Sequence, residues 1–306
     1  KLNYPEIGNL ATSLKILRSS GFLMDVVEGV ESIFTKQECV ILAKKQGIKV
    51  TSSASKEEAA ALGVDLIWQG DPTNYNVATQ VPIVDNVIAQ APDGLVLIPT
   101  DPNGLQASLD KAVAAGIAVA NVDTRVSDLS QVVTFITGDN TDGGTKAAEA
   151  IAAKIGYTEG ESYEVVVGLT SATATTNVAR LEGFQAAIEA NYPGIEIVDV
   201  AYSESNPQTA ASNVDNWLTK YPNLDGIFAI DGTNAAGAAA ALQAKGLVGK
   251  IKLIGYDAYP ANVDLIKKGV FTALIAQDPA AEARLAIQYL VATLDKNAAE
   301  IAKIKK

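Results

Sequence analysis

The sequence predicts an α/β protein made of two similar lobes, each built around a parallel sheet. Six short apolar runs each stop at a polar residue and precede a helical stretch; they are LVLIPTD, IAVANVD, VTFITGDN, GIFAID, IKLIGYD and TALIAQD. Continuous β-branched runs of this length are typical of buried parallel strands that helices cover on both faces. The helix–strand rhythm restarts near Gly138, which indicates a second lobe. Because ligands bind at the carboxyl ends of such strands, the polar ends predict a binding crevice.

In the first half of the chain, helices and strands alternate from about residue 56. Gly63 and Gly116 are placed to end helices, since glycine readily takes the left-handed conformation that comes after a last helical turn. The series is that of βαβ units with right-handed crossovers. The predicted elements are helix 56–62, strand 64–70, helix 78–90, strand 95–99, helix 105–115 and strand 117–122.

The second half repeats the alternation. Its predicted elements are strand 134–137, helix 145–155, strand 163–169, helix 178–191, strand 195–200, helix 208–221, strand 226–230, helix 234–245, strand 252–255, helix 261–268, strand 272–276 and helix 280–294. The strands and helices divide into two similar lobes only if the last strand and helix return to the first half. The lobes are assigned as 1–137 plus 278–298 and 138–277 plus 299–306.

The first 50 residues fit this pattern poorly. Residues 21–46 are predicted to form one long helix. The first strand of the sheet has two possible places, 13–17 or 48–51, and the pattern alone does not decide between them.

Composition narrows the function classes. The net charge of −11 argues against nucleic acid or an anionic membrane surface as a partner. The chain has no histidine, which excludes Ser–His–Asp triads, Cys–His pairs and HExxH zinc sites. Neither a P-loop core nor a GxGxxG turn comes after any strand, so no nucleotide cofactor and no metal is expected. A binding protein is therefore favoured over an enzyme.

Two smaller features bear on the cellular compartment. Cys39 is the only cysteine, so no intramolecular disulfide can form, and a buried apolar role is favoured over a reactive thiol. The first residues do not show the charged start and apolar core of a signal peptide. A processed, mature protein would have the same appearance.

The polar residues at the strand ends are distinguished by the sequence after each of them. Asp101 and Asp278 each precede a proline at the start of a helix, which favours a capping role. Asp123 and Asp257 do not lead directly into a helix, which favours a functional role. Asp231 could cap the next helix or contact a ligand.

Arg180 lies near the start of a predicted helix, where a positive charge is unfavourable with the helix dipole. A bound polar ligand or a carboxylate partner would account for its position. A solvated charge is the alternative.

From about residue 55 to residue 294 the chain resembles the type I periplasmic binding proteins of sugar ABC transporters, the ribose- and galactose-binding group. The resemblance rests on segments in the family's order: IPTD, GIAVANVDTR, FITGDNTDGG, VARLEGF, GIFAIDGTNAAGA, LIGYD and TALIAQDP. It implies two Rossmann-like lobes joined by a multi-strand hinge that close over a monosaccharide or polyol. It also implies a monomer without cofactors, periplasmic or extracellular, that docks on a membrane permease.

The resemblance also implies site residues. Asp123 corresponds to the aspartate of the first lobe that accepts hydrogen bonds from two sugar hydroxyls. The family has arginine directly after it, whereas here Thr124 intervenes and Arg125 comes one position later. Arg180 corresponds to the arginine of the second lobe that donates to the sugar.

Asp231 stands where ribose binders carry asparagine, Asp257 corresponds to the aspartate of the family's GFD segment, and Gln277 to a glutamine near the hinge. The family's aromatic residue on the second lobe falls near Ser205 and Asn206, so that stacking contact is missing. An aromatic wall could come from Trp68, Tyr75, Tyr256 or Tyr259. For Trp68, which ends a strand, a core role competes with stacking.

A ligand-responsive transcription regulator is the alternative function, because it shares the two-lobed core. The stretch VILAKKQGIKVTSSAS faintly resembles a helix-turn-helix. Only a short helix separates it from the strand VDLIWQG, and the acidic balance also argues against DNA binding.

Overall fold

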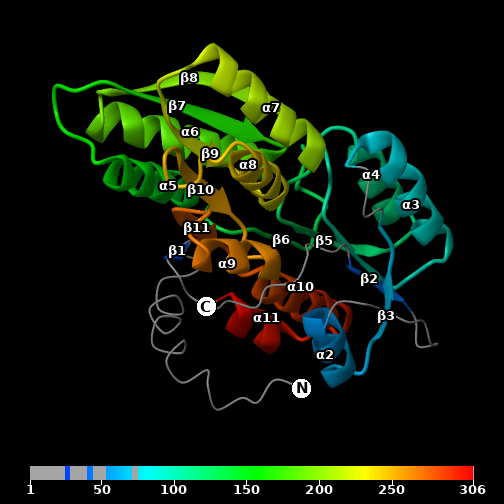
Figure 1. The fold of residues 1–306 in the computed structure, drawn as a ribbon. Coiled ribbons are helices and arrows are strands. Elements are labelled where there is room, and N and C mark those ends of the chain that lie inside the picture. The colour runs from blue at the N-terminus through cyan, green and yellow to red at the C-terminus, as the bar shows by residue number, and fades with distance from the viewer. Residues whose placement is uncertain (1–24, 28–39, 44–52, 71–74, 306) are drawn as a thin grey trace.

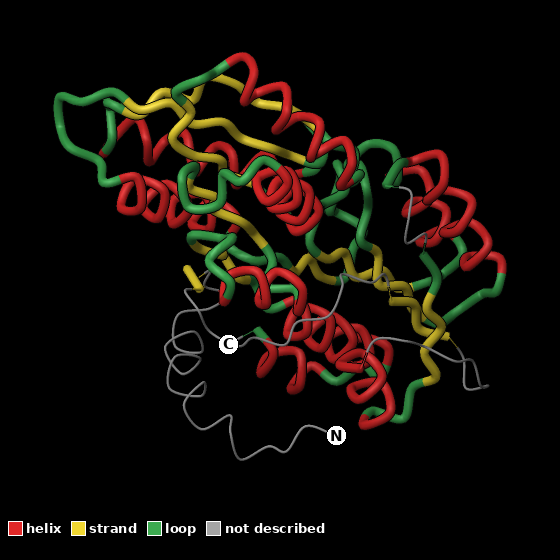
Figure 2. Tube along the Cα trace, viewed as in Figure 1, coloured by secondary structure: helices red, strands yellow, loops and turns green. Residues whose placement is uncertain are grey.

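The computed structural model describes residues 25–27, 40–43, 53–70 and 75–305. These residues form two sheets, and each sheet lies between layers of helices (Figures 1 and 2). None of the described helices has both the length and the apolar character that a membrane span requires. The predicted two-lobed α/β arrangement is therefore present.

The first sheet has the strand order β3-β2-β4-β5-β6. Its strands are β2 (Val40–Ala43), β3 (Asp65–Trp68), β4 (Gly94–Leu97), β5 (Ala118–Val122) and β6 (Thr134–Ile136). β4, β5 and β6 run parallel, whereas β2 runs antiparallel to both of its neighbours. Helices α3 (Val77–Ala89) and α4 (Gln106–Ala114) cover one face, and α2 (Ser53–Ala61) and α10 (Pro279–Leu294) cover the other. Strand side chains alternate between these two cores.

The second sheet has the order β1-β11-β10-β9-β7-β8. Its strands are β1 (Asp25–Val27), β7 (Tyr163–Leu169), β8 (Ile195–Tyr202), β9 (Leu224–Ala229), β10 (Lys252–Tyr256) and β11 (Ala273–Ala276). All of them run parallel except β1, which is antiparallel to β11. Helices α5 (Asn140–Ile155) and α6 (Thr175–Asn191) cover one face, and α7 (Pro207–Lys220), α8 (Gly232–Ala244) and α9 (Pro260–Lys267) cover the other.

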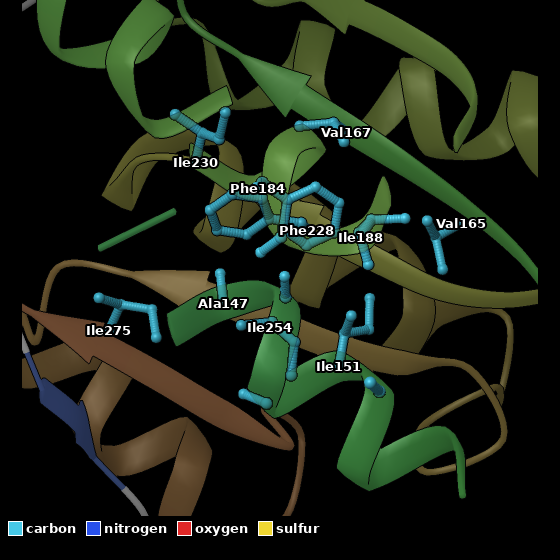
Figure 3. Close-up of a cluster of buried hydrophobic side chains, with 14 of the residues drawn as sticks. Ala147, Ile151, Val165, Val167, Phe184, Ile188, Phe228, Ile230, Ile254 and Ile275 are labelled. Carbon is cyan, nitrogen blue, oxygen red and sulfur yellow. The ribbon is translucent and has the colours of Figure 1, made fainter. Parts of the chain in front are cut away.

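Helix α6 is fixed in place by the apolar core that it forms with α5 and the second sheet. Phe184 of α6 stacks on Phe228 of β9, with 4.8 Å between the ring centroids (Figure 3). Helices α5 and α6 meet at two glycines: a Cβ added at Gly144 would overlap the carbonyl oxygen of Arg180, and one at Gly183 would overlap that of Thr141. Because both obstacles are backbone atoms, only glycine allows this approach.

Replacing Gly183 by alanine is expected to lower the free energy of unfolding by about 1–3 kcal/mol, because the helices must separate to admit the methyl group. Chemical denaturation measures this. The matched control is Ala186→Ser on the exposed face of the same helix, which we expect to change stability by less than about 0.5 kcal/mol. Equal stability of the two variants would contradict the close approach.

Two described segments, 137–139 and 277–278, connect the sheets. At the second of them the side chain of Asp278 accepts the N–H of Ala281 at 2.8 Å, so Asp278 caps α10 as predicted, with Pro279 in the first turn. Helix α10 then lies on the first sheet, where Gln288 donates to Glu58 of α2 at 2.8 Å. The last helix thus returns to the first half, as expected.

The last strand does not return with it. β11 pairs in parallel with β10 of the second sheet, so the expectation that strand 272–276 joins the first half is wrong. The chain crosses only after this strand. Helix α11 (Ala298–Ile304) then packs against α10, beside the first sheet (Figure 1).

The predicted helix at 21–46 is wrong where the structure describes it. Asp25–Val27 and Val40–Ala43 are strands, and they add to the second and first sheets respectively. Their Val- and Ile-rich sequences favour the extended backbone once strands are available to pair with: β11 for Asp25–Val27, and β3 and β4 for Val40–Ala43. The alternative first strands, 13–17 and 48–51, and Cys39 lie outside the described residues.

Candidate functional site

Two strands end in buried aspartates with left-handed backbone. Asp123 comes directly after β5 with φ 61°, and Asp257 directly after β10 with φ 63°. Each N–H still donates to a neighbouring strand, that of Asp123 to Ile136 at 2.8 Å and that of Asp257 to Ile275 at 2.9 Å. Aspartate tolerates this conformation better than most residues. The chain therefore turns off each sheet at its carboxyl end and leaves a buried carboxyl group there.

Arg180 is the centre of the buried polar cluster. Its helix begins at Thr175, three residues before the predicted start, which places Arg180 in the second turn. The side chain is 2% exposed, so the alternative of a solvated charge is wrong. Its guanidinium donates to Asn140 Oδ1 at 2.8 Å, to the carbonyl of Ile230 at 3.1 Å and to Gln277 Oε1 at 3.1 Å.

The surroundings of Arg180 keep it charged. Its guanidinium lies over the Tyr256 ring, 3.9 Å from the centroid. Burial alone would lower the pKa of Arg180, but Tyr256, Asp257, Asp123 and Asp231 more than offset this, so its pKa lies above the ordinary value. The carboxylate partners account for an arginine at this helix position.

Asp257 and Gln277 continue the network. Gln277 Nε2 donates to Asp257 Oδ1, and Asp257 Oδ2 accepts the N–H of Gly232 at 2.9 Å. Burial raises the pKa of Asp257, while Arg180 opposes this rise. Gln277 thus joins Arg180 to Asp257 and holds both in place.

Asp231 caps helix α8, which is one of the two roles expected for it. Its Oδ1 accepts the N–H groups of Thr233 at 3.0 Å and Asn234 at 2.9 Å, at the start of α8. Its Oδ2 accepts Thr170 Oγ1 at 2.8 Å and Asn234 Nδ2 at 2.7 Å. These four bonds occupy about all the acceptor positions of a carboxylate.

Asp123 and Arg125, from the first sheet, differ in where they lie. Burial raises the pKa of Asp123, and the nearby Arg180 opposes this rise. Arg125 is exposed and its guanidinium donates to the carbonyls of Val126 at 3.4 Å and Ser127 at 3.5 Å. The inserted Thr124, 1% exposed, occupies the position next to Asp123, so the structure does not bring the Arg125 guanidinium together with the buried cluster.

Two of the four candidate aromatic residues, Tyr259 and Trp68, also differ in where they lie. The Tyr259 ring lies against Gly232, where a Cβ would overlap it. Burial, together with Asp257 and Asp231, raises the pKa of Tyr259 well above its ordinary value, which places it beside the cluster. Trp68 instead packs on the core between the first sheet, α2 and α10, which is the core role that competed with stacking.

The sequence pattern does not single out two members of the cluster, Asn140 and Glu282. The pattern at Asn140 indicates only the crossing between lobes. Glu282 is 2% exposed and lies in the first turn of α10. It shares a helix face with the buried Ala286 and Leu290, four and eight residues later. A carboxylate within this apolar stripe is the feature of the sequence that could have pointed to Glu282.

The loops after β4 and β5 contact the start of α6, which covers the second sheet. The N–H of Arg125 donates to Thr175 Oγ1 at 3.0 Å, and Thr124 Oγ1 lies 3.4 Å from Thr176 Oγ1. A hydrogen bond from Thr173 lowers the pKa of Asp101. The two sheets therefore meet across the polar cluster as well as at the connecting segments.

Two α/β lobes with buried polar groups at facing strand ends define a two-lobed binding protein. The family described as "Periplasmic binding protein domain" matches residues 42–298, and the chain belongs to this family. The predicted family and fold class are thereby confirmed. Members of this family are transport binding proteins rather than enzymes.

Individual relatives are similar over most of the chain. The D-ribose/D-allose-binding protein of Pseudomonas aeruginosa is 28% identical over 229 residues, which cover 73% of this chain and 70% of the relative. The ribose import binding protein of Salmonella typhimurium is 31% identical over 226 residues, 74% of this chain and 73% of the relative. A solute-binding protein from Agrobacterium vitis bound with alpha-D-tagatopyranose has 31% identity and a TM-score of 0.74, covering 79% of this chain and 82% of that one.

Proposed function

We propose that this chain is the solute-binding protein of an ABC transporter and binds a monosaccharide or polyol between its lobes. The observation that carries the proposal is that the charge of Arg180, from α6, acts on the buried carboxyl group of Asp123, at the end of β5, across the contact between the sheets. The sugars named for its relatives support the ligand class. No P-loop or metal motif in the sequence points to another ligand class.

The chemistry of the cluster suits a polyhydroxyl ligand. Adjacent sugar hydroxyls both donate and accept, so they require a carboxylate beside a guanidinium or amide donor. We assign Asp123 as the acceptor of the first lobe and Arg180 as the donor of the second. Asp257 and Gln277 are assigned to the second-lobe side of the ligand, with Tyr259 as the apolar wall. Asp231 contributes through the helix that it caps.

Among the described residues, the first lobe is proposed to hold 40–137 and 278–298, and the second lobe 138–277. Asp25–Val27, assigned with 1–137 to the first lobe, is proposed to belong to the second, because β1 pairs with β11. Residues 299–305, assigned to the second lobe, are proposed to belong to the first, because α11 packs against α10. The segments 137–139 and 277–278 serve as the hinge. Hydrogen bonds between the loop after β5 and the start of α6, and the bond that Thr173 donates to Asp101 after β4, stabilise the closed form.

Replacing Thr175 by alanine is expected to weaken ligand affinity by about 2- to 10-fold. The closed form loses the hydrogen bond to the N–H of Arg125, which contributes about 0.5–1.5 kcal/mol. Isothermal titration measures the change. Thr175→Ser keeps the hydroxyl and is expected to bind like the wild type, and equal loss in both variants would argue against this role of the hydroxyl.

We propose a periplasmic or extracellular location, with a membrane permease as partner, and a monomeric state. The family membership supports the compartment, and the import function named for the relatives supports the permease. The regulator alternative is not favoured. Val40–Ala43, the start of its helix-turn-helix resemblance, is a strand.

Isothermal titration against aldoses, ketoses and polyols tests the ligand class. The panel includes D-ribose, D-allose, D-tagatose and xylitol. We expect one or a few of these to bind reversibly at one site per chain. Failure of every compound in a broad panel to bind would overturn the proposal, and turnover of a bound compound would indicate an enzyme instead.

A further inference from the structure

Glu282 is a buried carboxyl group that the proposed site does not yet use. It lies in the first turn of α10, directly after the crossing at Gln277 and Asp278. Its side chain is 2% exposed. Among the residues that the structure describes, Oε1 has no hydrogen-bond partner. An ionised carboxylate buried in this way is strongly unfavourable, so the group is either neutral or completed by a ligand.

The charged groups around Glu282 include the residues proposed to hold the ligand. The charges of Asp123, at the end of β5, of Arg180, from α6, and of Asp257, after β10, act on Glu282, as does that of Asp278, which caps the same helix. On the other elements packed against α10, charged groups face its later turns. Glu58 of α2 bonds Gln288, and Lys305, after α11, lies over Tyr289.

Three acidic neighbours and one basic neighbour favour the neutral form of Glu282. Burial raises the pKa of Glu282 well above its ordinary value of 4.5, Asp123 raises it further, and Arg180 opposes the rise. Arg180 directs its three hydrogen bonds to Asn140, Ile230 and Gln277, and none of these bonds reaches Glu282. A neutral carboxylic acid has one O–H to donate, and a sugar oxygen is a suitable acceptor.

We propose that Glu282 is a further recognition residue, whose neutral carboxylic acid donates a hydrogen bond to an oxygen of the ligand that Asp123 also holds. This assignment rests on the proposed function, because it requires a polyhydroxyl ligand between the lobes. The first lobe then supplies an acceptor and a donor side by side. Such a pair distinguishes a hydroxyl, which can satisfy both, from a group that only donates or only accepts.

Two variants test the role of the O–H group. Glu282→Gln keeps a neutral donor of similar shape, whereas Glu282→Leu keeps the volume and removes the donor. With the sugar of the panel that the wild type binds most tightly, we expect Glu282→Leu to bind about 10- to 100-fold more weakly, since a buried unpaired ligand oxygen is costly. Glu282→Gln is expected to bind within about threefold of the wild type, because its amide can still donate.

The pH dependence of the affinity shows whether Glu282 acts as a neutral acid or as a carboxylate. Wild-type affinity is expected to fall as the pH rises through the titration of Glu282, and that of Glu282→Gln to lack this fall. Because the folded-state pKa lies above 4.5, the stability of the wild type should also fall relative to Glu282→Gln as the pH rises above that value. An infrared carbonyl band of a protonated carboxyl group, present at pH 7 in the wild type and lost in Glu282→Gln, reports the same state without ligand.

Each result decides the assignment. Loss of affinity in Glu282→Leu with retention in Glu282→Gln supports it. Wild-type affinity in Glu282→Leu, with thermal stability confirming the fold, overturns it. Equal loss in both variants also overturns it and indicates a charged Glu282 that pairs with a cationic group of the ligand. If the wild type binds no sugar of the panel, the proposed function fails and this assignment fails with it.

Discussion

Replacing Arg180 by methionine is expected to lower the free energy of unfolding by about 3–5 kcal/mol and to abolish sugar binding. The guanidinium satisfies three buried acceptors, on Asn140, Ile230 and Gln277. It also supplies the positive charge that the buried Asp123 and Asp257 depend on. Without the guanidinium, the acceptors and carboxyl groups remain buried without a positively charged partner. Removing one partner of a buried ion network in this way is strongly destabilising.

Urea denaturation measures the stability of this variant, and isothermal titration measures its affinity. The matched control is Arg125→Met, because Arg125 is exposed and its guanidinium contacts only its own loop. We expect that control to change stability by less than about 0.5 kcal/mol and to leave the affinity nearly unchanged. Binding by Arg180→Met at wild-type affinity would contradict the site, and loss of binding in Arg125→Met would show that Arg125 reaches the ligand.

Replacing Asp123 by asparagine is expected to weaken sugar binding by about 10- to 150-fold, since a hydrogen bond to a charged group contributes about 1.5–3 kcal/mol. Asparagine is the suitable substitute because it tolerates the left-handed backbone of this position, with φ 61°, as aspartate does. The fold should therefore persist. Stability is expected to stay the same or rise, because burial disfavours the carboxylate form of Asp123.

Titration calorimetry and thermal unfolding of Asp123→Asn check the two halves of this expectation. Asp110→Asn, an exposed aspartate on α4 of the same lobe, is the matched control and should retain wild-type affinity. An unchanged affinity in Asp123→Asn would remove the first-lobe acceptor from the proposed site. A loss of both affinity and stability would assign Asp123 a structural role instead.

The strand ends show how much of the fold could be predicted from the sequence. The apolar runs before Asp123, Asp257 and Gln277 are strands β5, β10 and β11, because a continuous β-branched run needs no knowledge of its partners to be recognised. The strand with which β11 pairs could not be predicted in the same way. Strand pairing depends on where the chain crosses, and the number of elements placed this strand in the first half, although the assigned lobe bounds 138–277 kept it in the second.

Residues 21–46 show a different limit. Short apolar segments do not by themselves distinguish a helix from a strand, and the strands that pair with 25–27 and 40–43 come from other parts of the chain. No local signal in the segment reports those strands. The predicted long helix failed for that reason.

Members of the buried polar cluster could be predicted where a residue type is unusual for its position. Arg180 near a helix start and Asp123 with no helix directly after it are both unusual, and the structure brings them close. Arg125 lies apart from these two, because one inserted residue, Thr124, separates it from Asp123 and its guanidinium bonds carbonyls of its own loop. Glu282 was missed because an apolar stripe is sufficient to predict its helix, and a single carboxylate within the stripe is a weak signal.

A crystal structure of the protein with the most tightly bound sugar of the panel tests the central claim most directly. We predict one sugar enclosed between the lobes, with ligand oxygens within hydrogen-bond distance of both the Asp123 carboxylate and the Arg180 guanidinium. A sugar bound at another surface, or bound between the lobes without contact to either residue, would contradict the proposed site.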